Sequence, residues 1–195
     1  MKWLKIGLLL LAGLLFTGCT SREDIEESFP MSMEVEGFSA VNQDGEKVDL
    51  EDLKGSIWIT DFIFTNCDTV CLPMTANMAH LQNKLKEENL ESGVKLVSFS
   101  IDPENDTPDA LKEYSQRYQA DLKQWTFLTG YSQEDIELFA NRSFNSPAAK
   151  VDGSNQFVHG TSFYLVSDNG TVLKQYEGVS DPPFEEIIAD IKKLN

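Results

Sequence analysis

The sequence predicts an α/β fold in which helices cover a central mixed sheet. Two apolar runs, residues 56–64 and 94–102, are rich in β-branched and aromatic residues and have the length of strands. Their lack of alternating polar residues is typical of strands that are covered on both faces. Helical patterns separate and follow these runs, and turns typical of hairpins lie towards both ends of the chain. Strands that alternate with helices indicate parallel pairing through right-handed crossovers.

The first half of the expected fold begins with an N-terminal β-hairpin over residues 37–55, which turns at Gln43-Asp44-Gly45. The buried strand 56–64 follows and leads directly into a loop that contains two cysteines. A helix is expected next, with Pro73 in its first turn, because that is the part of a helix that tolerates proline. Apolar residues recur at helical spacing until Gly93 ends the segment, and they are Met74, Met78, Leu81 and Leu85.

The second half of the chain adds helices that begin at N-caps, one more strand and a second hairpin. Threonine, serine or aspartate before the first turn satisfies free backbone N–H groups, and proline fits the turn itself. The expected elements are a helix from Thr107-Pro108 to about Tyr118, a strand at 125–129, a helix from Ser132 to about Arg142, a hairpin at 162–178 turning at Asn169-Gly170, and a last helix capped by Asp181-Pro182.

The N-terminus has the features of a bacterial lipoprotein signal. Lys2 and Lys5 precede an apolar run that ends at Thr17-Gly18, and Cys19 follows directly. A charged start, a short apolar stretch and a cleavage site after small residues are typical of a secretory signal. The apolar run is short for a helix that spans a bilayer. We therefore expect residues 1–18 to be a lipoprotein signal peptide and the thiol of Cys19 to carry lipid, which places the chain on the outer face of the cytoplasmic membrane.

Residues 19–34 are expected to form a lipid-anchored flexible tether. They are polar and acidic, and they show neither a helical nor a strand period. Residues 35–195 then form one domain, which is long enough to bury an adequate core.

The chain is strongly acidic, with 16 basic and 32 acidic residues and a formal charge of −16. Cleavage before Cys19 removes Lys2 and Lys5, which leaves 14 basic and 32 acidic residues and a charge of −18. This charge excludes nucleic acid as a partner and excludes binding to anionic lipid through basic patches.

Two cysteines remain after lipidation, Cys67 and Cys71. Disulfides persist outside the cytoplasm, but a bridge between residues four apart closes too short a loop to stabilise the fold much. The pair follows the carboxyl end of a predicted central strand, where such sheets bind their ligands. It also lies at a helix N-terminus, which lowers the pKa of a thiol. The pair therefore predicts a functional site, either a redox pair or two metal ligands.

The chain has two histidines, and they have different expected roles. His80 is expected on the surface of the first long helix or partly packed there. His159 lies in a predicted loop just before the strand that starts near Ser162, and the glycine after it permits a close approach to other residues. Two thiolates and one imidazole are too few for a structural zinc site. Thiolates favour Cu(I) and an imidazole also suits Cu(II), so the set favours copper.

Three segments resemble the Sco/SenC family. They are TNCDTVCLPMT (65–75), FSIDPENDTPDAL (99–111) and VHGTSFYLVSDNG (158–170), in this order. The resemblance covers most of the chain from about Phe38 onwards. It implies a thioredoxin-like three-layer fold and a role in assembling the dinuclear copper centre in subunit II of cytochrome c oxidase. Within the second segment, Asp102-Pro103 and Asp106-Thr107-Pro108 are expected to end a strand and to cap the next helix.

The resemblance also implies that Cys67, Cys71 and His159 bind copper, as Cu(I), Cu(II) or both. Two positions depart from the family pattern. Leu72 stands where the family commonly has proline, and Val158 stands where many members have aspartate. Neither departure removes a ligand, but the second bears on the orientation of the imidazole and on its charge partner.

The leading expectation is a membrane-anchored copper-binding assembly factor that delivers copper to oxidase subunit II or prepares it. The alternative is a thiol–disulfide oxidoreductase in which Cys67 and Cys71 reduce the copper-site cysteines of that subunit, so it stays open whether the protein is an enzyme. Another copper chaperone or a thiol reductant is a further expected partner. Peroxide reduction is disfavoured, because Thr60 and Phe64 occupy the positions where peroxiredoxins have proline and a hydroxyl residue. A binding module with an inert disulfide is the remaining alternative.

Overall fold

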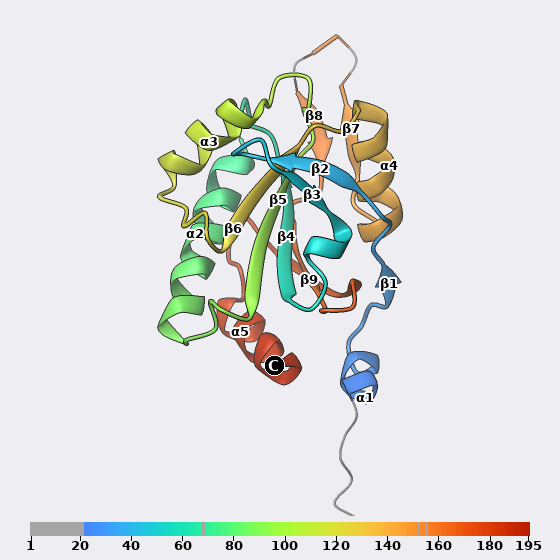
Figure 1. Cartoon of the computed structure of the whole chain (residues 1–195), viewed down its shortest axis with the longest axis vertical. Coiled ribbons are helices and arrows are strands. Elements are labelled where there is room, and N and C mark those ends of the chain that lie inside the picture. Colours follow the sequence, from blue (N-terminus) through green and yellow to red (C-terminus); the bar gives the residue numbers. More distant parts are fainter. Residues whose placement is uncertain (1–21, 68, 152, 155) are drawn as a thin grey trace, which may run out of the picture.

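The computed structural model describes residues 22–67, 69–151, 153–154 and 156–195 (Figure 1). The expected signal peptide and Cys19 lie outside the described residues. None of the described helices is both long enough and apolar enough to cross a membrane. The helices are α1 (Arg22–Glu27), α2 (Cys71–Glu87), α3 (Pro108–Arg117), α4 (Gln133–Phe144) and α5 (Phe184–Leu194), with a 3-10 turn at Leu50–Asp52. The strands are β1 (Met33–Glu34), β2 (Ser39–Asn42), β3 (Lys47–Asp49), β4 (Ile57–Ile63), β5 (Val94–Ser100), β6 (Trp125–Thr129), β7 (Ala148–Lys150), β8 (Phe157–His159), β9 (Ser162–Val166) and β10 (Thr171–Glu177).

The central sheet is mixed, as predicted, and its strand order is β1-β10-β9-β4-β5-β6-β2-β3. The strands β4, β5 and β6 run parallel, while the hairpins β2–β3 and β9–β10 and the other neighbours pair antiparallel. All seven residues of β4 are buried, which explains why this segment shows no polar alternation. The carboxyl ends of the three parallel strands therefore meet at one edge of the sheet.

Helices cover both faces of this sheet and give the predicted three layers (Figure 1). On one face, Phe62 of β4 stacks on Phe99 of β5, and both lie in the aromatic cluster that includes Phe144 of α4. On the opposite face, the ring of Tyr114 of α3 contacts Phe127 of β6, and its hydroxyl lies 2.7 Å from the Thr75 hydroxyl of α2. The thioredoxin-like arrangement implied by the resemblance is therefore confirmed.

The N-terminal segment differs from the expectation of a chain without regular structure. Residues 22–27 form α1, which packs near α5, and Met33 pairs with Val172 of β10 while Glu34 pairs with Thr171. A six-residue helix and a two-residue strand are too short to produce a readable period, so the sequence pattern could not predict them. The role of residues 19–34 as a tether stays a prediction.

Two predicted helix ends also differ from the structure. α5 begins at Phe184 with Pro183 as its N-cap residue and no side-chain cap, so the cap predicted at Asp181-Pro182 is wrong. Asp181 and Pro182 each precede a proline, which disfavours the helical region for both residues. α2 ends at Glu87, well before Gly93, because Asn89 has a left-handed φ of 57°. The predicted caps of α3 and α4, Thr107 and Ser132, are confirmed.

Asp61 is a carboxylic acid in the middle of β4, and its side chain is fully buried. Its Oδ1 accepts a hydrogen bond of 2.6 Å from the Ser98 hydroxyl, which in turn accepts one of 2.9 Å from Trp125 Nε1. Its Oδ2 has no hydrogen-bond partner among the described residues. Burial raises the pKa of Asp61 from 3.8 to about 7, and the Ser98 hydrogen bond opposes this shift only in part.

This raised pKa predicts that the protein loses stability as the pH rises from about 4 to about 7. Across this window the folded protein keeps a proton on Asp61 that the unfolded chain has lost, so each increase in pH favours unfolding. The total effect is at most about 4 kcal/mol, because one pKa unit is worth about 1.4 kcal/mol. Asp61→Asn imitates the neutral acid and is expected to flatten this dependence. Urea unfolding of both proteins at pH 4.5 and pH 8 measures the difference, and an equal pH dependence in the two would contradict the prediction.

Candidate metal centre

The cysteine loop lies at the carboxyl end of β4, at the sheet edge where the sequence predicts it. The chain continues from Ile63 through Phe64, and the backbone N–H of Cys67 donates to the Phe64 carbonyl at 3.3 Å. Cys71 is the first residue of α2, so its backbone N–H has no partner within the helix. This N–H donates to Cys67 Sγ at 3.4 Å instead. The helix N-terminus therefore holds the Cys67 sulfur close to Cys71.

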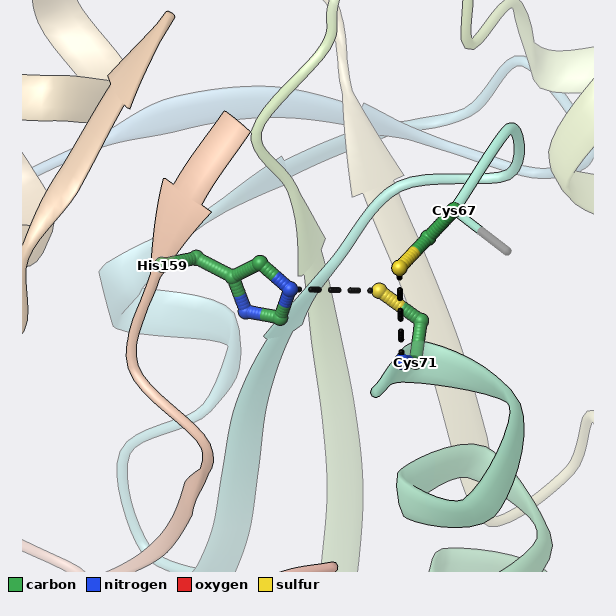
Figure 2. Close-up of side chains that lie close together, drawn as sticks. All are labelled: Cys67, Cys71 and His159. Atoms are coloured by element: carbon green, nitrogen blue, oxygen red, sulfur yellow. Dashed lines mark hydrogen bonds between the residues drawn. The ribbon is translucent and has the colours of Figure 1, made fainter. Parts of the chain in front are cut away.

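His159 is the last residue of β8 and faces the two cysteines (Figure 2). The expected loop position is wrong, because residues 157–159 pair with Ala148, Ala149 and Lys150 of β7 in a separate two-stranded sheet. Strands of three residues, of which only Phe157 is buried in β8, show too little alternation to be read from the sequence. The hairpin thus brings the imidazole to a loop that lies 88 residues earlier in the chain.

The tautomer of His159 follows from its second nitrogen. Nδ1 lies 2.8 Å from the carbonyl oxygen of Gly160, which can only accept a hydrogen bond, so Nδ1 carries the proton. Nε2 therefore presents its lone pair towards Cys71 Sγ, 3.3 Å away. Phe64 packs against the ring edge-on, with 5.8 Å between the centroids. A backbone carbonyl and a phenyl ring thus orient the imidazole, and the Val158 side chain beside it points to solvent with 54% of its surface exposed.

The pKa values of the two thiols are shifted in opposite directions in the metal-free protein. Hydrogen bonding with the Cys71 side chain, together with the backbone N–H groups of Thr69 and Cys71, lowers the pKa of Cys67 to about 4 although burial opposes this. The same contact with Cys67 and burial raise the pKa of Cys71 far above its usual value. The contact between the two side chains therefore favours a thiolate on Cys67 and a protonated thiol on Cys71. Both cysteines are free rather than bridged.

The three predicted site residues come together in space. The ligand atoms Cys67 Sγ, Cys71 Sγ and a ring nitrogen of His159 all lie within 4.8 Å of one another, close enough to bind a single metal ion. Two soft sulfur donors and one imidazole fit copper, whereas a structural zinc site takes four ligands. His80 lies apart from this group, on the exposed side of α2 with its ring 4.7 Å from that of Phe184. The expectation that His80 is a helix-surface residue is therefore confirmed.

Of two further features of the site, the sequence indicated the first only in part and the second not at all. Gly160 is a close-approach position, since a Cβ there would collide with the hydroxyl of the buried Ser146. Asp106 lies beside the cysteine loop and accepts hydrogen bonds from Thr65, although the sequence predicts only a helix-capping role for its segment. A glycine after a histidine signals the first feature weakly, and nothing in the spacing signals the second.

The sequence profile of the SCO1/SenC family matches residues 27–195. The chain is 49% identical over 186 residues to the SCO1 protein homolog of Bacillus subtilis (strain 168), and the match covers 95% of each chain. It is 50% identical to a SCO1/SenC family lipoprotein from Bacillus anthracis str. Ames, with a TM-score of 0.80 over 83% of this chain and 95% of that chain.

Two further solved structures are similar. One is BsSco, a member of the Sco family of cytochrome c oxidase assembly proteins in which a disulfide switch was identified, at 52% identity and a TM-score of 0.78 over 85% of this chain and 95% of that chain. The other is Arabidopsis thaliana ScoI with copper bound, at 29% identity and a TM-score of 0.67 over 82% of this chain and 96% of that chain. The profile match and the identities over nearly the whole length show that the chain belongs to the SCO1/SenC family.

Proposed function

We propose that the chain binds one copper ion through the sulfurs of Cys67 and Cys71 and Nε2 of His159. The observation that carries the proposal is the convergence of the three ligand atoms within 4.8 Å. The donor set supports copper, because two thiolates bind Cu(I) well and the imidazole makes the site suitable for Cu(II) too. The similarity to a ScoI protein solved with copper bound supports the same metal.

Copper at this site is cargo for cytochrome c oxidase. The chain delivers it to the dinuclear copper centre of subunit II, or prepares that centre to receive it. Support comes from the similarity to BsSco, a member of a family of cytochrome c oxidase assembly proteins. A site with only three protein ligands leaves room for a ligand of the recipient, which suits transfer rather than permanent storage.

A second function, disulfide reduction, is favoured by the unequal acidities of the two thiols. The Cys67 thiolate attacks a disulfide of subunit II and forms a mixed disulfide, releasing one thiolate of the partner. The Cys71 thiol then passes its proton to the released thiolate, and its sulfur attacks the Cys67 sulfur, which releases the partner's second thiolate; this thiolate takes its proton from water. The chain loses two electrons and becomes the disulfide, and the partner gains them as two thiols. The disulfide form binds no metal, so the oxidation state of the pair gates copper loading.

The protein is held at the outer face of the cytoplasmic membrane by lipid on Cys19. The sequence before this cysteine and the similarity to a SCO1/SenC family lipoprotein support this localisation. Cys19→Ser is expected to remove the lipid and, with it, this means of holding the mature protein at the membrane. Fractionation and mass spectrometry of the N-terminal peptide check this. A wild-type N-terminal peptide in which Cys19 carries no lipid would contradict it.

A transfer experiment tests the delivery function. The copper-loaded full-length chain in mild detergent is mixed with the metal-free, reduced copper domain of subunit II, and the two proteins are separated and assayed for copper. We expect most of the copper on subunit II. In a second arm the domain is supplied with its cysteines oxidised and the chain reduced and metal-free, and thiol formation on subunit II would support disulfide reduction instead. Copper retained by the chain in the first arm argues against delivery.

Gly160→Ala is expected to weaken copper binding about tenfold, the loss typical of disturbing a residue that orients a ligand. The added methyl group collides with the hydroxyl of the buried Ser146, and we expect residues 159–160 to give way, which strains the hydrogen bond of 3.0 Å that the Gly160 N–H donates to the Pro147 carbonyl. The shift moves the imidazole relative to Cys71. Gly37→Ala is the matched control, since nothing lies within 4 Å of a Cβ there. Competition titration with a copper chelator measures both variants, and equal affinities would refute the role of Gly160.

A further inference from the structure

Asp106 is a fully buried carboxylate beside the cysteine loop that is not one of the three ligands. It lies between β5 and α3, directly before the N-cap Thr107, and its own backbone N–H donates to the Asp102 carbonyl at 2.9 Å. A buried carboxylate is costly unless hydrogen bonds satisfy it, and burial raises the pKa of Asp106. A helix-capping role alone does not require this carboxylate, because the Thr107 hydroxyl already caps Ala110.

The groups that satisfy the carboxylate come from the loop that leads to Cys67. The Thr65 hydroxyl donates to Oδ1 at 2.5 Å, and the Thr65 backbone N–H donates to Oδ2 at 3.1 Å. The third donor is the Ser100 hydroxyl at 2.6 Å from Oδ2. Ser100 is fixed in turn, since its carbonyl accepts a hydrogen bond of 2.7 Å from Tyr131. The carboxylate thus joins the cysteine loop to the rigid end of β5.

These contacts act on the chain two residues before the first sulfur. Thr65 follows Phe64 at the end of β4, and the turn that places Cys67 closes with the bond from Cys67 N–H to the Phe64 carbonyl. Hydrogen bonds to a charged acceptor are roughly twice as strong as neutral ones and are more directional. Two of them on one residue fix both its backbone and its side chain. Asp106 therefore holds Thr65 at the point where the chain leaves the sheet towards Cys67.

We propose that Asp106 is a positioning residue for the metal centre. Through Thr65 it holds the loop so that Cys67 Sγ meets Cys71 Sγ and His159 Nε2 before any metal arrives. Asp106 does not itself bind the metal, because both its oxygens are committed to Thr65 and Ser100. The inference deepens the proposed function and rests on copper binding at the three ligands.

Asp106→Asn tests this with a change of nearly constant volume. The amide keeps one acceptor oxygen, but its NH₂ group is a donor and faces the donor groups of Thr65 or Ser100. The hydrogen bonds that hold the loop are therefore weakened or lost. We expect copper affinity to fall by about tenfold to 100-fold, as for other groups that orient metal ligands, and the sulfur-to-copper absorption band to shift. Thr65→Val, which removes only the hydroxyl donor, is expected to show a smaller loss of copper affinity. Thr65→Ser, which keeps the hydroxyl, is expected to keep the wild-type affinity and band position.

Asp190→Asn is the matched control for a loss of general stability. Asp190 is also a buried aspartate, bound by Lys174 and Tyr176, and these contacts belong to β10 and α5 rather than to the cysteine loop. This variant is expected to melt at a lower temperature and to bind copper normally. Wild-type affinity and an unshifted band in Asp106→Asn, or a loss as large in Asp190→Asn, would overturn the proposal.

A metal-free measurement separates this proposal from the proposed function. In the reduced full-length chain Cys71 has no exposed surface, so its alkylation by iodoacetamide reports local opening of the loop. Asp106→Asn is expected to raise the alkylation rate of Cys71 about tenfold, while Asp190→Asn leaves it unchanged. If the wild-type chain binds no copper, the proposed function fails, and the alkylation rates still decide whether Asp106 holds the loop. Equal rates in Asp106→Asn and wild type would then refute the role of Asp106.

Discussion

Replacing Cys71 with serine is expected to abolish both copper binding and disulfide exchange. In the proposed centre Cys71 supplies one of two sulfur ligands, and its sulfur lies next to both Cys67 Sγ and His159 Nε2. Serine offers a weakly acidic hydroxyl that binds copper poorly and forms no disulfide. The loss of affinity should exceed the roughly 100-fold that is typical of losing a group that only orients a ligand. Chelator competition measures the affinity, and thiol counting after mild oxidation measures the disulfide.

The controls for this substitution address folding. Cys71 is fully buried at the start of α2, so the thermal unfolding of the metal-free variant is measured alongside. Cys67→Ser is expected to give the same two losses, because the sulfurs act as a pair. A folded Cys71→Ser variant that still binds copper with near wild-type affinity would contradict the three-ligand centre.

His159→Ala is expected to separate the two functions. Removal of the imidazole should lower copper affinity by more than about 100-fold, since a ligand is lost and not merely an orienting group. The Cys67–Cys71 pair keeps its spacing and its helix N-terminus, so reduction of a disulfide substrate should proceed at a rate close to that of wild type. His80→Ala is the matched control, because His80 lies on the surface of α2 and away from the sulfurs. A parallel loss of both activities in His159→Ala would show that the histidine serves the redox chemistry as well.

The elements that the sequence predicts well carry a strong local signal, which is either complete burial or a side-chain cap. β4 is recognisable because all seven residues are buried, and α3 and α4 are recognisable because Thr107 and Ser132 cap them with side-chain hydrogen bonds. β1, β7 and β8 are two or three residues long and mostly exposed, so their pairing depends on partners distant in the chain. Their positions follow from tertiary contacts and not from local pattern.

The features of the site also divide into those that local sequence predicts and those that depend on tertiary contacts. The position of Cys67 and Cys71 at a strand end and a helix start follows from local sequence, and the structure confirms it. The approach of His159 was expected from the glycine after it and from the family resemblance, but not its strand position, because the β7–β8 hairpin that carries it has no sequence pattern of its own. The tie between Asp106 and Thr65 joins residues 41 positions apart and depends on the register of β4 and β5.

The most direct test of the central claim is a titration of the reduced full-length chain with Cu(I) and with Cu(II), beside His159→Ala. We expect the wild-type chain to bind one copper ion per chain, with a sulfur-to-copper absorption band in the Cu(II) form. His159→Ala is expected to lose tight binding and to change or lose this band. Tight binding of one copper ion by His159→Ala, with an unchanged band, would contradict a centre formed by Cys67, Cys71 and His159.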